Sequence, residues 1–273
     1  MVVAVRTGTG ARPGPGQDRT VSSDTFVRSL DRGLAVIRAF DEQHRRLTLS
    51  DVARRTGLTR AAARRFLLTL VELGYVDHAD GLFRLRPRVL ELGFAYLSGL
   101  ALPEVAQPHM EQLSARLHES CSVSVLDGDD LVYVGRVHAR KIMKAAIAVG
   151  SRFPAYPTSM GRVLLAGAPQ EWLEGYLSRV DPQPLTPLTV TDRDRLREVL
   201  AGVRAQGYAV VDQELELGLR SMAVPVHDQA REVVAAMNIS APLERGSVEE
   251  ITAELLPPLR EAAARLEEDL LAR

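Results

Sequence analysis

Cysteine is almost absent from this chain of 273 residues, in which Cys121 is the only thiol. One cysteine cannot form an intramolecular disulfide, so the sequence favours a reducing compartment, and we expect a cytoplasmic protein. Cys121 starts a predicted strand, where a small buried residue is expected rather than a nucleophile. Long apolar runs are also missing, since none approaches the roughly 20 residues of a membrane helix. We therefore expect no membrane span, and residues 1–20 lack the apolar core of a secretion signal.

Patterns that bind metals or nucleotides are absent as well. The six histidines, at positions 44, 78, 109, 118, 138 and 227, form no pair at the close spacing of metal ligands. No P-loop, GxGxxG or GxSxG sequence occurs. Glu214 and Glu216 lack a partner nucleophile, and we expect both to be solvated surface residues. The sequence therefore predicts no metal and no cofactor, and it argues against an enzyme.

Lysine is rare, occurring only at positions 141 and 144, and the basic charge that remains is unevenly distributed. Residues 1–90 contain sixteen Arg against nine Asp and Glu, a net charge of +7. Residues 91–273 contain eighteen basic and twenty-six acidic side chains, a net charge of -8. This asymmetry predicts that the N-terminal part faces a polyanion, with chance clustering as the alternative.

Two helices separated by a tight turn are predicted within the basic part, after an amphipathic helix over 26–40. Thr48 is a plausible N-cap, and Asp51 three residues later completes a capping box. Gly57 ends this short helix, and Thr59 caps the next one. The second helix carries an apolar stripe made of Ala63, Phe66, Leu67, Leu70 and Leu73.

Helix, glycine-containing turn and helix is the signature of a helix-turn-helix, whose second helix enters the major groove of DNA. Asp80-Gly81 between two apolar runs predicts a hairpin after that helix, which would form a wing. A plain helical hairpin with a solvated charged face is the alternative. The residues expected to contact DNA are Thr48, Thr59, Arg60, Ala61, Arg64 and Arg65.

The C-terminal half alternates hairpins of β-branched strands with helices, which predicts an α+β fold with an antiparallel sheet. Strands are expected over 121–126, 131–137, 208–211, 221–226 and 233–240, with a further one at 142–149. Helices are expected over 105–119, 159–166, 170–177 and 191–206, with one or two over 248–271. The predicted organisation is a disordered tail (1–25), a winged helix-turn-helix domain (26–86), a linker helix (87–102) and a larger domain (103–273).

LTLSDVARRTGLTRAAARRFLLTLVELGYV, at 47–76, resembles the DNA-binding pattern of the IclR family of bacterial regulators, and the resemblance extends over 26–273. The run LTRAAARRFLLTL is similar to the branch that controls protocatechuate and para-hydroxybenzoate catabolism, the β-ketoadipate pathway. The resemblance implies a transcriptional regulator with a GAF-like effector domain. An aromatic acid or pathway intermediate is the expected ligand. The alternative is a regulator that senses a short keto acid or a sugar derivative. An enzyme with a DNA-binding appendage is a remote alternative.

Three segments, 150–166, 207–226 and 235–242, resemble the family's effector-pocket motifs. The first opens a predicted helix whose free N–H groups would favour a carboxylate. Met160 and Met222, which lie in the first and second segments, suit contact with an aromatic ring, and filling of the core is the alternative for both. Arg136 and Arg220 could also reach a carboxylate, although surface ion pairs are favoured for both. The effector positions implied by the resemblance are Ser159, Met160, Gly161, Asp212, Met222, Asn238 and Ser240.

One helix-turn-helix reads only a few base pairs, so we expect a dimer on an inverted-repeat operator. The resemblance adds the possibility of a tetramer. The sequence does not distinguish an activator from a repressor. The dimer surface is expected on the apolar linker helix, at Val89, Leu90, Leu92, Phe94 and Leu97.

Overall fold

The computed structural model describes residues 26–41, 43–97, 101–139 and 147–272, and the chain divides into two compact units between Gly99 and Leu100. The smaller unit contains α1 (Arg28–Arg38), β1 (Leu47–Thr48), α2 (Leu49–Thr56), α3 (Arg60–Glu72), β2 (Val76–Ala79), β3 (Leu82–Leu85), η1 (Pro87–Val89) and α4 (Leu90–Leu97). Its three strands form an antiparallel sheet in the order β1-β3-β2. This arrangement is the predicted winged helix-turn-helix.

Local signals in the sequence place the helix-turn-helix. The Thr48 side chain accepts a hydrogen bond from the Asp51 amide, and the Thr48 amide donates one to the Asp51 carboxylate. Gly57 ends α2 with a φ of +67°, a conformation that disfavours any side chain. Thr59 caps α3. The wing turns at Asp80 and Gly81, both with positive φ, as a two-residue hairpin turn of matching twist requires.

Helix α1 buries only part of the apolar stripe of the predicted amphipathic helix. Leu30 and Leu34 have helical spacing in the sequence, but their side chains are 62% and 44% exposed. The residues that enter the core are Val36, Ala39 and Phe40, at the C-terminal end of the helix. Leu73, predicted on the buried stripe of α3, is half exposed because the helix ends before it.

The larger unit contains one six-stranded antiparallel sheet in the order β6-β5-β4-β9-β8-β7. Its strands are β4 (Ser120–Asp127), β5 (Asp130–Val137), β6 (Arg152–Pro154), β7 (Ala209–Asp212), β8 (Leu219–His227) and β9 (Val233–Pro242). Its helices are α5 (Ala101–Leu117), α6 (Ser159–Gly167), α7 (Gln170–Arg179), α8 (Arg193–Gln206) and α9 (Val248–Leu271), with the short η2 (Leu243–Arg245) before α9. The strand predicted at 142–149 lies largely outside the described residues, and the two strands that pair with β5 are β4 and β6.

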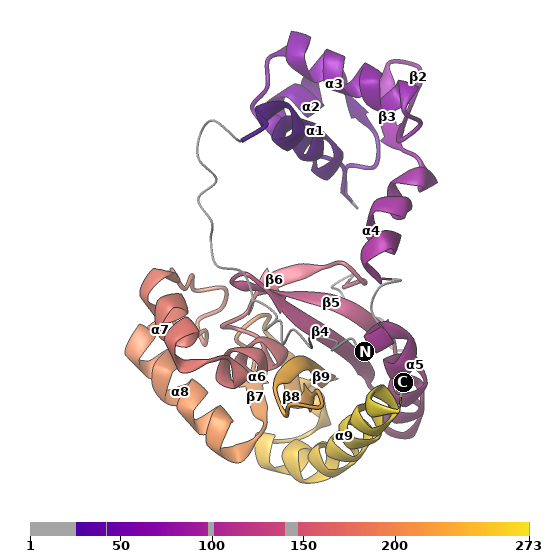
Figure 1. The fold of residues 1–273 in the computed structure, drawn as a ribbon. Helices are drawn as coiled ribbons and strands as arrows, with labels where there is room; N and C mark the ends of the chain where they lie inside the picture. The colour runs from indigo at the N-terminus through magenta and orange to yellow at the C-terminus, as the bar shows by residue number, and fades with distance from the viewer. Residues whose placement is uncertain (1–25, 42, 98–100, 140–146, 273) are drawn as a thin grey trace, which may run out of the picture. The chain divides into compact units, whose positions relative to one another are not determined.

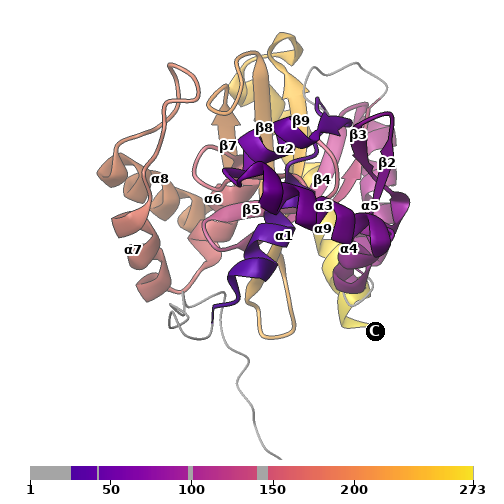
Figure 2. The ribbon, with the colours of Figure 1, turned by 90° about the horizontal axis from the view of Figure 1, so that it is seen from above.

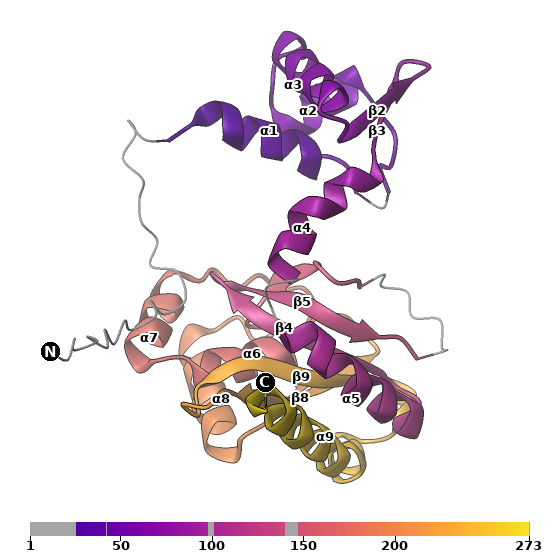
Figure 3. The same cartoon turned by 45° about the vertical axis from the view of Figure 1, so that its right-hand side comes forward.

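Helices cover both faces of this sheet. The long helices α5 and α9 lie side by side on one face, which we call the α5–α9 face (Figure 1 and Figure 3). Helix α6 packs on the other, the α6 face, and α8 packs on α6. Figure 2 shows α7 and α8 side by side at one edge of the unit, where their apolar side chains share a core. Among the described helices, none combines the length and apolar character needed to cross a membrane.

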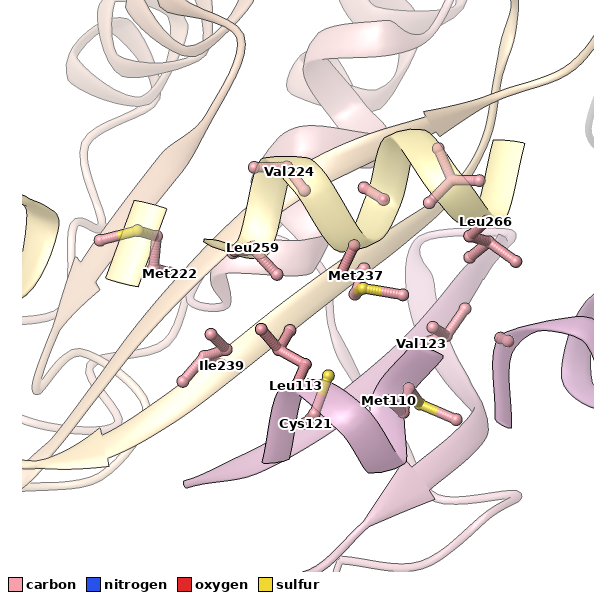
Figure 4. Close-up of a cluster of buried hydrophobic side chains, with 14 of the residues drawn as sticks. Met110, Leu113, Cys121, Val123, Met222, Val224, Met237, Ile239, Leu259 and Leu266 are labelled. Carbon is pink, nitrogen blue, oxygen red and sulfur yellow. The ribbon is translucent and has the colours of Figure 1, made fainter. Parts of the chain in front are cut away.

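Alternation along the central strands decides which face each side chain joins. Cys121 and Val123 of β4, and Met237 and Ile239 of β9, enter the core between the sheet and α9 (Figure 4). The residues between them point to the α6 face, where Ala236 packs in a separate core. The α5–α9 face is thus apolar throughout its centre, whereas the α6 face combines apolar and polar side chains.

Candidate functional site

Helix α3 presents its N-terminal half to solvent on one side and to the core on the other. Arg60, Ala61, Arg64 and Arg65 are all exposed. The opposite side of the helix is buried against α1 and α2 through Ala63, Leu67 and Leu70. The structure therefore holds four of the predicted DNA-contact residues together on the outer surface of a helix fixed by its core.

The arginines of α3 differ from others in the same unit in what they contact. Arg55 and Arg84 are ion-paired with Asp41 and Asp77. The side chains of Arg60, Arg64 and Arg65 make no hydrogen bond or ion pair to any residue that the structure describes, so their guanidinium groups remain available to a ligand. Guanidinium binds both phosphate and the guanine edge in a two-pronged geometry.

Thr48 and Thr59, both predicted to contact DNA, differ in the hydrogen bonds that their hydroxyl groups make. The Thr48 hydroxyl accepts from the Asp51 amide and donates to the Asp51 carboxylate at 2.7 Å, so both of its functions are occupied. The Thr59 hydroxyl accepts from the Ala62 amide and keeps its hydrogen free of any described partner. Thr59 retains the capacity to donate to a phosphate, whereas Thr48 has a structural role in capping α2.

Sequence reasoning missed basic residues near the wing. Arg45 and Arg46 are exposed, precede β1 directly and have no described partner. Arg46 lines a hollow of about 240 Å³ together with Arg84 and the wing residues Asp80 and Phe83. The available signal was the Arg45–Arg46 pair itself, which lay outside the two predicted helices.

Polar side chains form two adjoining rows on the α6 face. In the first row, Arg136 of β5 lies opposite Ser122 of β4, which lies opposite Asn238 of β9. Ser122 and Asn238 are buried, and Arg136 is half-buried. The neighbouring row crosses β4, β9 and β8 through Ser120, Ser240 and Ser221.

Two buried polar atoms at this face have no hydrogen-bond partner among the described residues. One is Oδ1 of Asn238, whose Nδ2 donates to Ser240 Oγ at 3.2 Å. The other is Oγ of Ser159, which begins α6 and is 1% exposed. Met160 follows it and accepts from Ser124 Oγ at 3.2 Å. A buried polar atom without a partner costs free energy, which a bound ligand or a water molecule at this face could recover.

Arg136 contributes a charge to the same face. Its Nη1 donates to Ser122 Oγ at 3.0 Å, and its guanidinium lies 5.8 Å from the centre of the Tyr133 ring. Burial lowers the pKa of Arg136 and raises that of Tyr133. Burial and the Arg136 charge also lower the pKa of His138, which accepts from Arg136 Nε. No carboxylate among the described residues contacts Arg136, so its charge is balanced by neutral groups alone.

Two predicted effector positions are not brought to this site. Asp212 and Met222 belong to the opposite side of the sheet. Met222 is buried against α9 in the core shown in Figure 4, and Asp212 pairs with Arg220 at 2.7 Å. The positions that face α6 are the preceding residues, Val211 and Ser221, which pair with each other. A shift of one residue moves a strand side chain to the other face, which is why these two positions lie apart from Asn238 and Ser240.

Gly161, another predicted effector position, lies in the first turn of α6. Its amide already donates to the Thr158 hydroxyl, so it is not free to bind a carboxylate. A Cβ at position 161 would lie 2.1 Å from the carbonyl oxygen of Ala155. Glycine is needed here because the backbone of residue 155 passes too close for any side chain.

Glu214 corrects the prediction of a solvated surface residue. It is buried and binds Arg162 of α6 through two hydrogen bonds of 2.7 and 2.6 Å. Arg162 also donates to the Tyr156 carbonyl, and Glu214 accepts from the Val190 amide. This pair ties the helix that carries Ser159 to the loop between β7 and β8. Arg220 forms the ion pair that was favoured for it, and Arg136 does not among the described residues.

No group of three or more His, Cys, Asp or Glu side chains within the described ranges could hold a metal ion. The features that can act chemically are therefore an arginine-rich helix surface in one unit and a buried polar array in the other.

Comparisons with known proteins agree with both units. Residues 29–80 match the IclR helix-turn-helix domain, and residues 94–268 match the bacterial transcriptional regulator IclR C-terminal family. The Pca regulon regulatory protein of Pseudomonas putida is 44% identical over 88% of this chain and 83% of its own. A crystal structure from Rhodococcus sp. RHA1 is 59% identical, with a TM-score of 0.80, over 90% of this chain and 98% of its own. An IclR homologue from Microbacterium hydrocarbonoxydans, crystallised with 4-hydroxybenzoate, is 32% identical with a TM-score of 0.78, over 90% of this chain and 100% of its own. This chain belongs to the IclR family of bacterial transcriptional regulators.

Proposed function

We propose that this protein is a cytoplasmic regulator of aromatic catabolism genes, which binds an aromatic carboxylic acid at the α6 face and thereby changes its affinity for operator DNA. The observation that carries the proposal is the buried polar array, in which Arg136 lacks a carboxylate and Asn238 lacks a donor among the described residues. Buried groups of this kind are stabilised by a ligand that supplies the missing partners.

An aromatic ligand is supported by the apolar residues beside the array. Tyr133 and Met160 are almost fully buried on the same face, and sulfur and ring edges pack well against an aromatic ring. The similar Microbacterium protein binds 4-hydroxybenzoate in its crystal, and the similar Pseudomonas protein regulates the Pca regulon. Because its relatives are regulators, the protein is expected to bind this ligand and release it unchanged. Recovery of unaltered ligand after incubation tests that expectation.

For DNA binding, the functional units are the predicted domains at 26–86 and 103–273, with 87–102 as the linker. Two copies of α3 in a dimer would read an inverted-repeat operator. The contact residues are Thr59, Arg60, Ala61, Arg64 and Arg65, with Arg45 and Arg46 reaching the flanking phosphates.

The experiment is calorimetry of the full chain against 4-hydroxybenzoate, protocatechuate, pyruvate and a sugar acid. Operator affinity is then measured by fluorescence anisotropy with and without each ligand that binds. We expect an aromatic acid to bind and to change operator affinity by roughly 5- to 150-fold, the usual range of coupling between sites. Binding of pyruvate or the sugar acid alone would replace the aromatic assignment with a regulator of another metabolite.

A further inference from the structure

We infer that Arg88 is a positioning residue for DNA recognition, which fixes the C-terminal end of α3 to the start of the linker helix α4. A movement of α4 then displaces the recognition helix with it, and the response of operator binding to the effector depends on this one side chain. The inference rests on the proposed function and adds the residue that couples the linker to the DNA-reading helix.

The Arg88 side chain contacts both sides of the junction between the helix-turn-helix and the linker. Its Nη1 donates to the carbonyl oxygen of Leu73 at 2.9 Å, directly after the last residue of α3. Its Nε donates to Glu91 Oε2, in the first turn of α4, at 3.3 Å. Its guanidinium also lies 5.4 Å from the centre of the Tyr75 ring, which packs on the core of this unit. One guanidinium thus connects the end of α3, the core and the start of α4.

The end of α3 favours a cation at this place. The last carbonyl groups of a helix have no partner within the helix and carry partial negative charge. The sequence of the last turn of α3 contains no basic residue, so Arg88 supplies the positive charge from the linker. A Cβ at Gly74 would lie 3.4 Å from Arg88 Nη1, which shows how closely the guanidinium passes over the turn. The contact is therefore part of how α3 ends.

Arg88 makes the side-chain attachment of the linker to the helix-turn-helix. Within the described part of 87–97, no other side chain forms a hydrogen bond to a residue before position 86. The remaining connection is main-chain, since the Arg86 amide donates to the Tyr75 carbonyl oxygen at 2.8 Å. A single main-chain hydrogen bond leaves rotation about the following backbone bonds open, so the Arg88 contacts set the direction in which α4 leaves this unit.

These contacts give a physical route from the linker to DNA. The chain continues from α4 into the unit that contains the polar array, so a change there reaches α3 through the linker. Hydrogen bonds to bases and phosphates are short and directional, and a displaced α3 loses them. With the Arg88 contacts intact, α3 follows α4. Without them, α4 moves alone and operator affinity no longer reports the state of the other unit.

The test is the ratio of operator affinities with and without saturating ligand, measured by fluorescence anisotropy on the full-length protein with 4-hydroxybenzoate and, in parallel, protocatechuate. The wild type is expected to show a ratio of roughly 5- to 150-fold with at least one of the two acids. Arg88→Met keeps an apolar stem beside Tyr75 but removes the donors, and its ratio should fall to less than about twofold. Arg88→Lys keeps the charge and one donor toward Leu73, and its ratio should lie between those of the Met variant and the wild type. Calorimetry without DNA should give the same ligand affinity in all three proteins.

Arg54→Met is the matched control, because Arg54 is another exposed arginine of this unit that pairs with a carboxylate three residues away, Asp51. It should keep the wild-type ratio. Circular dichroism and sedimentation velocity verify that each variant folds and assembles as the wild type does, and Arg88→Lys serves as the test if the Met variant does not fold.

A wild-type ratio in either Arg88 variant would overturn the inference and leave the proposed function intact. Lower stability or weaker ligand-free operator binding with an unchanged ratio would give Arg88 a purely structural or phosphate-binding role instead. Dissociation of the assembly in the variants would place Arg88 in the surface between two copies, which also overturns the inference. If neither acid changes operator affinity in the wild type, the proposed function itself fails.

Discussion

The arginines at the start of α3 allow the predicted DNA contacts to be tested one side chain at a time. Arg60→Ala and Arg64→Ala should each weaken operator binding by about 1–3 kcal/mol and relax the preference at one base pair if the side chain reads a guanine. If the side chain touches only phosphate, its replacement should instead weaken binding to all sequences equally. It should also reduce the slope of log affinity against log salt concentration by about one unit. Anisotropy titrations at several salt concentrations separate the two cases.

Arg195→Ala is the control for these titrations, because Arg195 is ion-paired with Glu198 on a helix of the other unit. Operator affinity is expected to stay at the wild-type level in this variant. An unchanged affinity and salt slope for both α3 variants would remove this helix from DNA recognition.

At the same scale, alternation in the strands explains which of the predicted effector positions lie together on the α6 face and which do not. Asn238 and Ser240 were predicted on one face, and the register places both on the α6 face beside Ser122 and Ser120. Met222 and Ser221 are adjacent and were not separable without the register, because each could be the inward residue of a strand buried on both sides. Glu214 could not be recognised as buried, since its partner Arg162 is distant in the chain.

At the scale of elements, the first turn of α6 packs so closely on the backbone of Ala155 that a methyl group at Gly161 would not fit. A Cβ at Gly161 would lie 2.1 Å from Ala155 O, whereas a Cβ at Gly202 of α8 would meet nothing within 4 Å. Gly161→Ala should therefore destabilise the fold by about 1–3 kcal/mol through forced displacement of the backbone. Gly202→Ala is the matched control and should stabilise it by about 0.5–1 kcal/mol, the difference in helix propensity. Urea unfolding measures both, and equal stability of the two variants would contradict the close approach.

The link between α6 and the β7–β8 loop makes a second prediction at this scale. Arg162 and Glu214 have side-chain exposures of 3% and 9%, so removing one charge leaves the other buried without compensation. Glu214→Gln should cost about 3–5 kcal/mol of unfolding free energy. The double variant Arg162→Met, Glu214→Leu removes both charges and should recover most of that loss. A single variant as stable as the wild type would show that the pair is not needed to hold the loop.

Helix α9 shows what an element's sequence can and cannot establish. Pro257 and Pro258 left open whether residues 248–271 form one helix or two, and the structure has one. The buried residues before and after the prolines keep helical spacing across them, so packing outweighs the lost backbone hydrogen bonds. That spacing was present in the sequence at Ile251, Leu255, Leu259, Ala262 and Leu266.

For the whole molecule, the apolar surface of the N-terminal unit bears on assembly. Leu90, Leu92 and Phe94 of α4 are 71%, 52% and 67% exposed, an unusual concentration of large apolar side chains on one short helix. The exposed Leu30 and Leu34 of α1 add to the apolar surface of the same unit. Burying each large side chain contributes about 1.5–3 kcal/mol, so a second copy packed on this surface would be held firmly. The side chain of Leu97 lies outside the described set.

The expected result is a dimer, with Leu90→Glu and Phe94→Glu each shifting it toward monomer in sedimentation velocity at micromolar concentration. Operator affinity should fall as dimerisation is lost, because a monomer reads one half-site and loses the specificity that two provide. Leu188→Glu is the matched control: Leu188 is 52% exposed on the other unit, and its variant should remain dimeric. A wild-type protein that sediments as a monomer both with and without operator DNA would refute the dimer. If the wild type dimerises and neither α4 variant dissociates, α4 is excluded as the surface that joins the two copies. In that case the inverted-repeat model of recognition would stand on a different interface, for which α1 is the next surface to vary.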